Sequence, residues 1–266
     1  MSPIDVDAVS VTPARTSCIS EATRLLRHNA AVIVCGRPHG ADDVAPLLRS
    51  VLGGDVVNIG EPVEVRAAGG RDRPDLDADG HEQRSPLHSD GFALADGAPD
   101  VLALACETSV PGGDSFMVDM NSVYAQLLSA GGEWAELARF LVEHPVDQTE
   151  PGKVSSIGTI GLRVGAGRIV WRCSYHLAPL ADDPQYDRTR SVLGRWMTLL
   201  AELAEQATRF HLETGETLLA DNTVVFHGRD PYEDRKRLLW RVWAWTPRAV
   251  RPETSDVVSD TSWVAG

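Results

Sequence analysis

Short apolar runs broken by polar turns dominate the first half of the sequence. The run AAVIVCG predicts a buried strand that ends at Gly36, and ISEATRLLRHN before it predicts a short helix over 19–29. The following stretch DDVAPLLRSVLGGD predicts a second helix, because acidic residues begin it and a glycine pair ends it. From residue 101, VLALACETSV and DSFMVDM read as strands separated by the PGG turn at 111–113.

The second half adds helices between strands. Two helices are expected near 120–144, a strand over 168–174, and the longest helix over 187–208, where apolar residues form one stripe at helical spacing. The block ETLLADNTVVFHGRDPYEDRKRLLWRVWAWTP then predicts strand, turn, strand, loop and strand. Strands and helices do not alternate regularly, so the pattern favours an α+β fold over a doubly wound parallel sheet.

A chain of 266 residues suits a single domain over 1–266. Within it we expect a flexible N-terminus over 1–17 and a C-terminal tail over 250–266. The Gly-, Asp- and Arg-rich segment 66–84 has no apolar period and predicts a lid or mobile loop. A second lid is expected in the segment 147–160.

Composition excludes several classes of protein. The chain carries 25 Lys and Arg against 38 Asp and Glu, a formal net charge of −13, which argues against nucleic acid and anionic membrane surfaces as partners. No apolar run approaches the ~20 residues that span a bilayer, and the start of the chain lacks the pattern of a secretory signal. The four cysteines form no CxxC pair, so we expect reduced thiols in a cytoplasmic protein that binds a small molecule.

The segment SPLHSDGF offers a candidate metal site. His88 and Asp90 are two residues apart, so in an extended segment both side chains point to one face. The predicted strand TVVFHGRD adds His227. Two histidines and one carboxylate form the facial triad of non-haem Fe(II) oxygenases. The HxD pattern alone is better explained by ordinary polar contacts, so the interpretation as a metal site depends on its neighbours in the sequence.

The strand RKRLLWRVWAW is one such neighbour. It places Arg237 and Arg241 on a face shared with Leu239, Trp243 and Trp245. Arginines on a mostly apolar face need a partner, either a small dicarboxylate in a pocket or a protein carboxylate in a structural salt bridge. Trp243 then either lines that pocket or belongs to the core.

The turn PGGDS is the other neighbour. Ser115 directly follows it and is either a simple turn residue or a hydroxyl that binds the same carboxylate as an arginine.

Together, SPLHSDGF, PGGDS, DNTVVFHGR and the arginine-bearing strand resemble the taurine dioxygenase/clavaminate synthase-like group over residues 85–245. These proteins are Fe(II)- and 2-oxoglutarate-dependent oxygenases. The resemblance implies a double-stranded β-helix (jelly roll) core with flanking helices. It implies that His88, Asp90 and His227 bind Fe(II), that 2-oxoglutarate chelates the iron, and that O2 is consumed.

The same resemblance implies roles for the other candidates. Ser115 would contact 2-oxoglutarate, and either Arg237 or Arg241 would hold its C5 carboxylate. The strand pattern favours Arg237 for this contact. Arg241 would then lie nearer the iron and hold the C1 end or a carboxylate of the primary substrate. Asp90 occupies the position that is a small residue in the halogenases of the family, which favours oxygenation.

The expected reaction is hydroxylation of an unactivated C–H bond in a small polar metabolite that bears an amine or a carboxylate. An amino acid or a natural-product intermediate fits this description, and succinate and CO2 would be released. Two alternatives remain open: a metal-dependent hydrolase or isomerase on a jelly roll, and a non-catalytic jelly-roll binding protein. Metal content and 2-oxoglutarate turnover distinguish the three.

Overall fold

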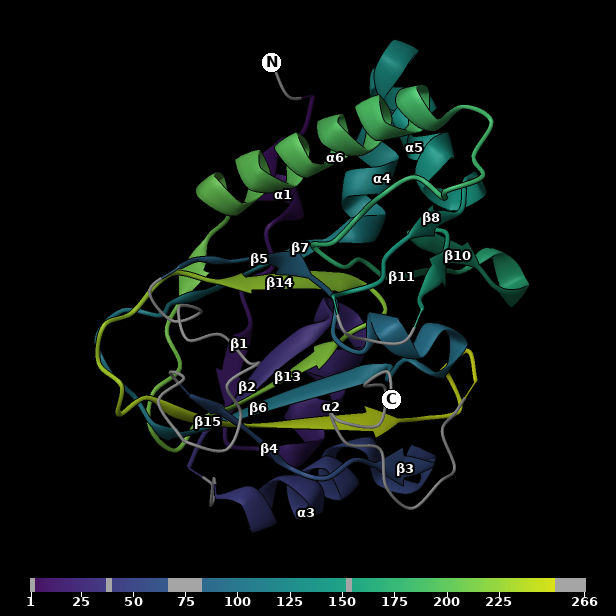
Figure 1. Cartoon of the computed structure of the whole chain (residues 1–266). Helices are drawn as coiled ribbons and strands as arrows, with labels where there is room; N and C mark the ends of the chain where they lie inside the picture. Colours follow the sequence, from purple (N-terminus) through teal and green to yellow (C-terminus); the bar gives the residue numbers. More distant parts are fainter. Residues whose placement is uncertain (1–2, 37–39, 67–82, 152–154, 252–266) are drawn as a thin grey trace.

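Two β-sheets lie between outer layers of helices (Figure 1), as seen in a computed structural model that describes residues 3–36, 40–66, 83–151 and 155–251. Helices α2 and α3 lie below the larger sheet in this view, and α4, α5 and α6 lie above the smaller one. The space between the two sheets receives the inward-facing side chain of every second strand residue.

The larger sheet has seven strands in the order β1-β2-β13-β6-β15-β3, with β4 also paired to β15. Only the β1–β2 pair is parallel. The strands are β1 (Ala14–Thr16), β2 (Ala31–Val34), β3 (Asn58–Ile59), β4 (Val63–Arg66), β6 (Val101–Thr108), β13 (Thr217–Asp221) and β15 (Leu238–Trp245). Alternation sends Val32 and Val34 outward onto helices α2 (Ile19–Asn29) and α3 (Ala41–Leu52), while Ile33 faces the other sheet.

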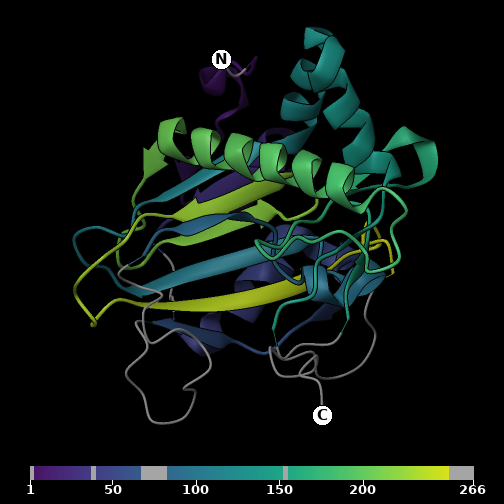
Figure 2. The ribbon, with the colours of Figure 1, turned by 45° about the horizontal axis from the view of Figure 1, so that its top comes forward.

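The smaller sheet is antiparallel, in the order β12-β7-β14-β5. Its strands are β5 (Ser85–His88), β7 (Ser115–Asp119), β12 (Arg209–Phe210) and β14 (Val225–Arg229). Phe116 and Phe226 on its outer face pack in one cluster with residues of α4 (Met120–Ala130), α5 (Gly132–Glu143) and α6 (Tyr186–Gln206). Met117 points the other way and packs with Leu239 of the larger sheet. Helix α6 runs across the smaller sheet (Figure 2).

Shorter elements complete the described chain. They are helix α1 (Val6–Val9), the antiparallel pairs β8 (Val146–Asp147) with β9 (Ile157–Gly158) and β10 (Gly161–Arg163) with β11 (Ile169–Trp171), and the 3-10 turns Gly53–Asp55, Phe92–Gly97 and Gly165–Gly167. None of the helices in the described residues has the length and apolar character needed to cross a membrane.

The sandwich of antiparallel sheets with flanking helices confirms the predicted α+β, jelly-roll fold. The segment 1–17, where the sequence suggests a flexible terminus, contains α1 and β1, because β1 hydrogen-bonds to β2 and the side chain of Val9 is buried. The predicted lid 66–84 and the predicted tail 250–266 lie largely outside the described residues. Strands β8 and β9 occupy part of the second candidate lid.

Candidate metal centre

The two candidate histidines are brought together by strand pairing. His88 ends β5 and lies directly opposite His227 of β14. Opposite residues of an antiparallel pair point to the same face, which here is the inner one, and the two imidazole centroids are 4.4 Å apart. Asp90 follows in a tight turn at Gly91, whose φ is +67° and where an added Cβ would lie 2.5 Å from Cδ of Pro99. Glycine is therefore required for Asp90 to come back to the histidines.

The three side chains converge through one atom each. Oδ1 of Asp90 lies 3.5 Å from Nε2 of His88 and 3.6 Å from Nε2 of His227. All three ligand atoms lie within 4.8 Å of one another. Neighbouring ligands of an octahedral ion at about 2.1 Å lie roughly 3 Å apart, so small side-chain shifts would bring the three atoms onto one ion.

Contacts to Nδ1 of His88 and Oδ2 of Asp90 determine which of their other atoms face the point where the three side chains converge. Nδ1 of His88 lies 2.8 Å from the carbonyl oxygen of Pro86 and donates to it, because a carbonyl only accepts, so the lone pair is on Nε2. Oδ2 of Asp90 accepts a 2.8 Å hydrogen bond from Nε1 of Trp243 and lies 3.5 Å from Nη1 of Arg241. Oδ1 of Asp90 and both Nε2 atoms are thus directed to the common point.

Asn222 holds the backbone of Asp90. Its Oδ1 accepts a hydrogen bond from the Asp90 amide, and its Nδ2 donates to the Asp90 carbonyl, each over 2.9 Å. The same Nδ2 donates to the Pro99 carbonyl over 2.8 Å. Asn222 is in the turn before β14, so the strand that carries His227 also positions the carboxylate ligand.

Electrostatics favour the metal-binding protonation states of Asp90 and His227. Burial alone would raise the pKa of Asp90, but Arg241 and the two histidines outweigh it and hold that pKa far below its ordinary value. Burial, with His88 and Arg241 close by, lowers the pKa of His227 to about 3. Two imidazoles and one carboxylate converging on one point are a donor set that fits Fe(II).

Arg237 lies just before β15 and is only 4% exposed. Its Nη2 donates to the carbonyl of Gly113 over 3.3 Å, and its Cζ lies 4.9 Å from the ring centroid of Tyr232. Its Nη1 is buried and has no hydrogen-bond partner among the described residues. Burial lowers the pKa of the guanidinium below its ordinary value. This is a buried cation with a donor left for an anion.

Ser115 lies on the same inner face as the histidines. It begins β7, two residues before Met117, which is the residue opposite His227. Two residues along a strand span about 7 Å. Ser115 is 8% exposed and follows the turn that contacts Arg237. The inner face of this sheet therefore carries the histidines at one end and the Ser115 hydroxyl at the other, beside the turn that contacts Arg237.

The structure brings His88, Asp90, His227 and Arg241 together and places Arg237 beside the turn that precedes Ser115. Sequence reasoning missed Asn222 and Tyr232, and left the role of Trp243 open. The Asp-Asn pair before β14 was a visible turn signal, but nothing in the sequence indicated which backbone it would bind.

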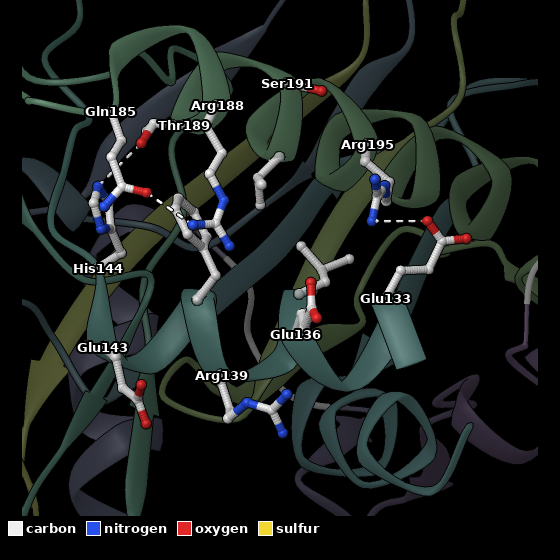
Figure 3. A pocket seen from close by; sticks show the side chains of 13 residues that line it. Glu133, Glu136, Arg139, Glu143, His144, Gln185, Arg188, Thr189, Ser191 and Arg195 are labelled. Carbon is white, nitrogen blue, oxygen red and sulfur yellow. Dashed lines mark hydrogen bonds and ion pairs between the residues drawn. The ribbon is translucent and has the colours of Figure 1, made fainter. Parts of the chain in front are cut away.

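A pocket of about 410 Å³ lies elsewhere, between α5 and α6 (Figure 3). Glu133 and Arg195 form an ion pair of 3.1 Å at one end, and His144 bonds to Thr189 and Asp183 at the other. None of the residues that line this pocket is a predicted site residue.

Comparison with known proteins agrees with this geometry. Residues 169–243 match the family model described as taurine catabolism dioxygenase TauD, TfdA family. This segment includes His227 and both arginines and excludes His88 and Asp90. No curated protein sequence matches the chain.

Solved structures share the fold at low sequence identity. Asparagine oxygenase has a TM-score of 0.60 and 15% identity over 90% of this chain and 83% of that chain. PvcB from Pseudomonas aeruginosa has a TM-score of 0.57 and 17% identity over 86% and 80%. The non-heme iron oxygenase OrfP has a TM-score of 0.58 and 15% identity over 91% and 84%.

These structural likenesses bear on the fold. The family match covers the strand that carries His227 and the arginine-bearing strand, and the His88, Asp90 and His227 cluster could hold a metal ion. Over residues 169–243 the chain is therefore similar to the TauD, TfdA family of dioxygenases.

Proposed function

We propose that this protein hydroxylates a C–H bond of a small amine- or carboxylate-bearing metabolite, a free amino acid or a natural-product intermediate, and releases succinate and CO2. One observation carries the proposal. Arg237 is a buried cation whose Nη1 has no hydrogen-bond partner among the described residues, and it lies in the same sheet sandwich as a facial triad. A metal-dependent hydrolase or a simple binding protein would leave this unpaired cation unexplained.

His88, Asp90 and His227 would hold the iron. When bound, Fe(II) supplies the activation of O2 that oxidation of a C–H bond requires. The protein fixes the geometry: Trp243 and Arg241 orient the carboxylate through Oδ2, and the Pro86 carbonyl orients His88. The buried surroundings exclude water from the site. Asp90 occupies the ligand position itself, which supports oxygenation as the outcome.

Arg237 and Ser115 would bind the C5 carboxylate of 2-oxoglutarate. A charge-assisted hydrogen bond in a shielded site contributes about 1.5–3 kcal/mol. Arg237 already lies against Gly113 and Tyr232, so little side-chain freedom is lost when the anion binds. The preference for Arg237 over Arg241 rests on this burial and on the position of Arg241 beside Asp90.

Arg241 is the basis for the substrate class. Its side chain is 22% exposed and its Nη1 lies 3.5 Å from Oδ2 of Asp90, so it is a cation at the metal end of the site. A carboxylate of the primary substrate, or the C1 end of 2-oxoglutarate, would pair with it. Asparagine oxygenase was solved with 3-hydroxyasparagine, and OrfP with (3S)-hydroxy-L-Arg. The amino-acid products in these similar structures support testing amino acids first as substrates.

The test begins with anaerobic addition of Fe(II) and then 2-oxoglutarate to wild type and to His227→Ala, followed by visible absorbance. We expect a weak charge-transfer band in wild type only. Succinate release is then scored over a panel of amino acids and amine-bearing metabolites. Iron bound without a band would overturn the 2-oxoglutarate assignment. A band with succinate release stimulated only by compounds that lack both amine and carboxylate would overturn the substrate class.

A further inference from the structure

A chain of hydrogen bonds crosses the outer end of the turn that contacts Arg237. Oγ of Ser109 lies 2.8 Å from Nε2 of His211, and Nδ1 of His211 lies 2.6 Å from Oδ1 of Asp114. Ser109 follows β6, His211 follows β12, and Asp114 immediately precedes β7. The chain thus joins three segments that are far apart in the sequence, and its position is separate from the metal cluster.

Asp114 is the carboxylate that the fold places next to Arg237. It directly follows Gly113, whose carbonyl accepts from Nη2 of Arg237 over 3.3 Å. An added Cβ on Gly113 would lie 3.1 Å from Nε of Arg237, which shows how closely the guanidinium lies against this turn. The negative charge of Asp114 acts on Arg237 and favours its protonated form.

Two other carboxylates near this turn, Asp230 and Glu216, are bonded to arginines other than Arg237. Asp230 accepts hydrogen bonds from Arg84 and Arg209, and Glu216 accepts from Arg15. Asp114 differs because its partner is a histidine. With the histidine removed, Asp114, which directly follows the Gly113 carbonyl that Arg237 contacts, would be free to turn toward Arg237.

A buried guanidinium that lacks a carboxylate partner is strongly stabilised when it forms an ion pair, since charge-assisted hydrogen bonds are the strongest in proteins. If Asp114 formed that pair, it would occupy the donor that an incoming carboxylate needs. The bond to His211 directs Asp114 away from this alternative. Nη1 of Arg237 remains without a hydrogen-bond partner among the residues that the structure describes.

We propose that His211 is a positioning residue for co-substrate binding: by holding Asp114, it prevents an internal Asp114–Arg237 pair and keeps Arg237 available to the C5 carboxylate of 2-oxoglutarate. This inference rests on the proposed function. His211 itself touches neither the metal ligands nor the co-substrate.

The test is a titration of 2-oxoglutarate into the Fe(II)-loaded protein without O2, with the charge-transfer band as readout. We expect His211→Ala to raise the dissociation constant about tenfold, equivalent to about 1.4 kcal/mol. Asp114→Asn is expected to bind 2-oxoglutarate at least as tightly as wild type, because a negative charge near the anion site is removed. The double variant is expected to bind within about twofold of Asp114→Asn, since no carboxylate is left to compete.

Two further variants serve as controls. Ser109→Ala removes only the outer bond of the chain and is expected to bind 2-oxoglutarate within about twofold of wild type. His211→Gln keeps a donor for Asp114 and is expected to recover part of the affinity lost in His211→Ala. Fe(II) affinity is expected to be the same in all variants.

Whether each variant raises or lowers the dissociation constant of 2-oxoglutarate distinguishes a positioning role of His211 from general disruption of the turn. If both single variants weaken binding and the double variant is weaker still, His211 and Asp114 simply support the turn, and the inference is wrong. An unchanged dissociation constant in His211→Ala also overturns it. Absence of the band in wild type would instead overturn the proposed function, so the two failures are distinguishable.

Discussion

The metal cluster and the pocket between α5 and α6 both contain charged residues, but these residues differ in burial and in pairing. Between the sheets, Asp90 and Arg237 are each under 5% exposed, and Nη1 of Arg237 has no hydrogen-bond partner in the described part of the chain. In the helix pocket, Glu133 and Arg195 pair with each other, and their side chains are 61% and 37% exposed (Figure 3). The charged pair in the helix pocket is therefore matched and open to solvent, whereas Arg237 is buried without a carboxylate partner among the described residues.

This difference indicates which region binds a ligand. Exposed ion pairs are worth little and are common on helical surfaces. A buried cation without a matching anion destabilises the free protein, and it persists where a ligand supplies the missing charge. Burial of a cation without a partner, rather than pocket volume, is therefore our basis for proposing the functional site between the sheets. The following predictions test that distinction, beginning with the largest effect.

The largest effect is expected for His227→Ala. This variant removes one of the three proposed metal ligands. Removing a residue that only hydrogen-bonds to a metal ligand typically lowers metal affinity about 10–100-fold, so the loss of Fe(II) affinity in His227→Ala should be larger than that. Iron retained after desalting measures it, and circular dichroism checks the fold. Retention of iron at the wild-type level would contradict the assignment of His227 as a ligand.

Arg237→Met should separate binding from stability. Loss of one charge-assisted contact, from Nη1, is expected to raise the dissociation constant of 2-oxoglutarate about 10–100-fold, while Fe(II) affinity is unchanged. The thermal midpoint of the ligand-free protein should not fall, because a buried unpaired charge is replaced by an apolar side chain of similar length. Arg237→Lys keeps the charge without the planar fork and should bind with intermediate affinity.

A lower thermal midpoint in Arg237→Met, with co-substrate binding unchanged, would mean that Arg237 is a structural residue. Both regions of the comparison would then contain satisfied charges, and the argument from burial would fail.

Asn222→Ala should weaken Fe(II) binding about tenfold, because it removes two hydrogen bonds that hold the Asp90 backbone. Asn121→Ala is the matched control: its Oδ1 accepts from Nε1 of the core residue Trp171 over 2.9 Å. The control should lower thermal stability and leave Fe(II) affinity unchanged. Equal metal affinities in the two variants would assign Asn222 a purely structural role.

Parts of this site were accessible from the sequence because they depend on local periodicity. The spacing of His88 and Asp90, and the alternation that places Arg241 with Leu239 and Trp243, follow from the two-residue period of a strand. Strands such as β2, β6, β13 and β15 and the helices α2 to α6 were predictable for the same reason, since each is a run of about 4–20 residues with its own apolar pattern.

What the sequence did not yield depends on pairings between distant segments. Trp243 reaches Asp90 across 153 positions, and Asn222 reaches it across 132. The strand order β1-β2-β13-β6-β15-β3 likewise joins the two ends of the chain in one sheet. Such contacts arise from sheet topology, and local propensity does not specify it. That Nη1 of Arg237 has no hydrogen-bond partner among the described residues depends on the side chains that surround it, so it could be seen only in the structure.

The smallest effect is expected at the helix pocket. Glu133→Gln and Arg195→Gln each break an exposed ion pair, so the free energy of unfolding should change by less than about 1 kcal/mol. Fe(II) and 2-oxoglutarate affinities should stay within about twofold of wild type, because neither residue touches the sheet sandwich that holds the cluster. Succinate release with the best substrate of the panel is the decisive measurement. A several-fold change in that rate, with iron and 2-oxoglutarate binding unaltered, would show that paired surface charges at α5 and α6 act on the reaction. Burial without a partner would then be an incomplete guide to function in this fold.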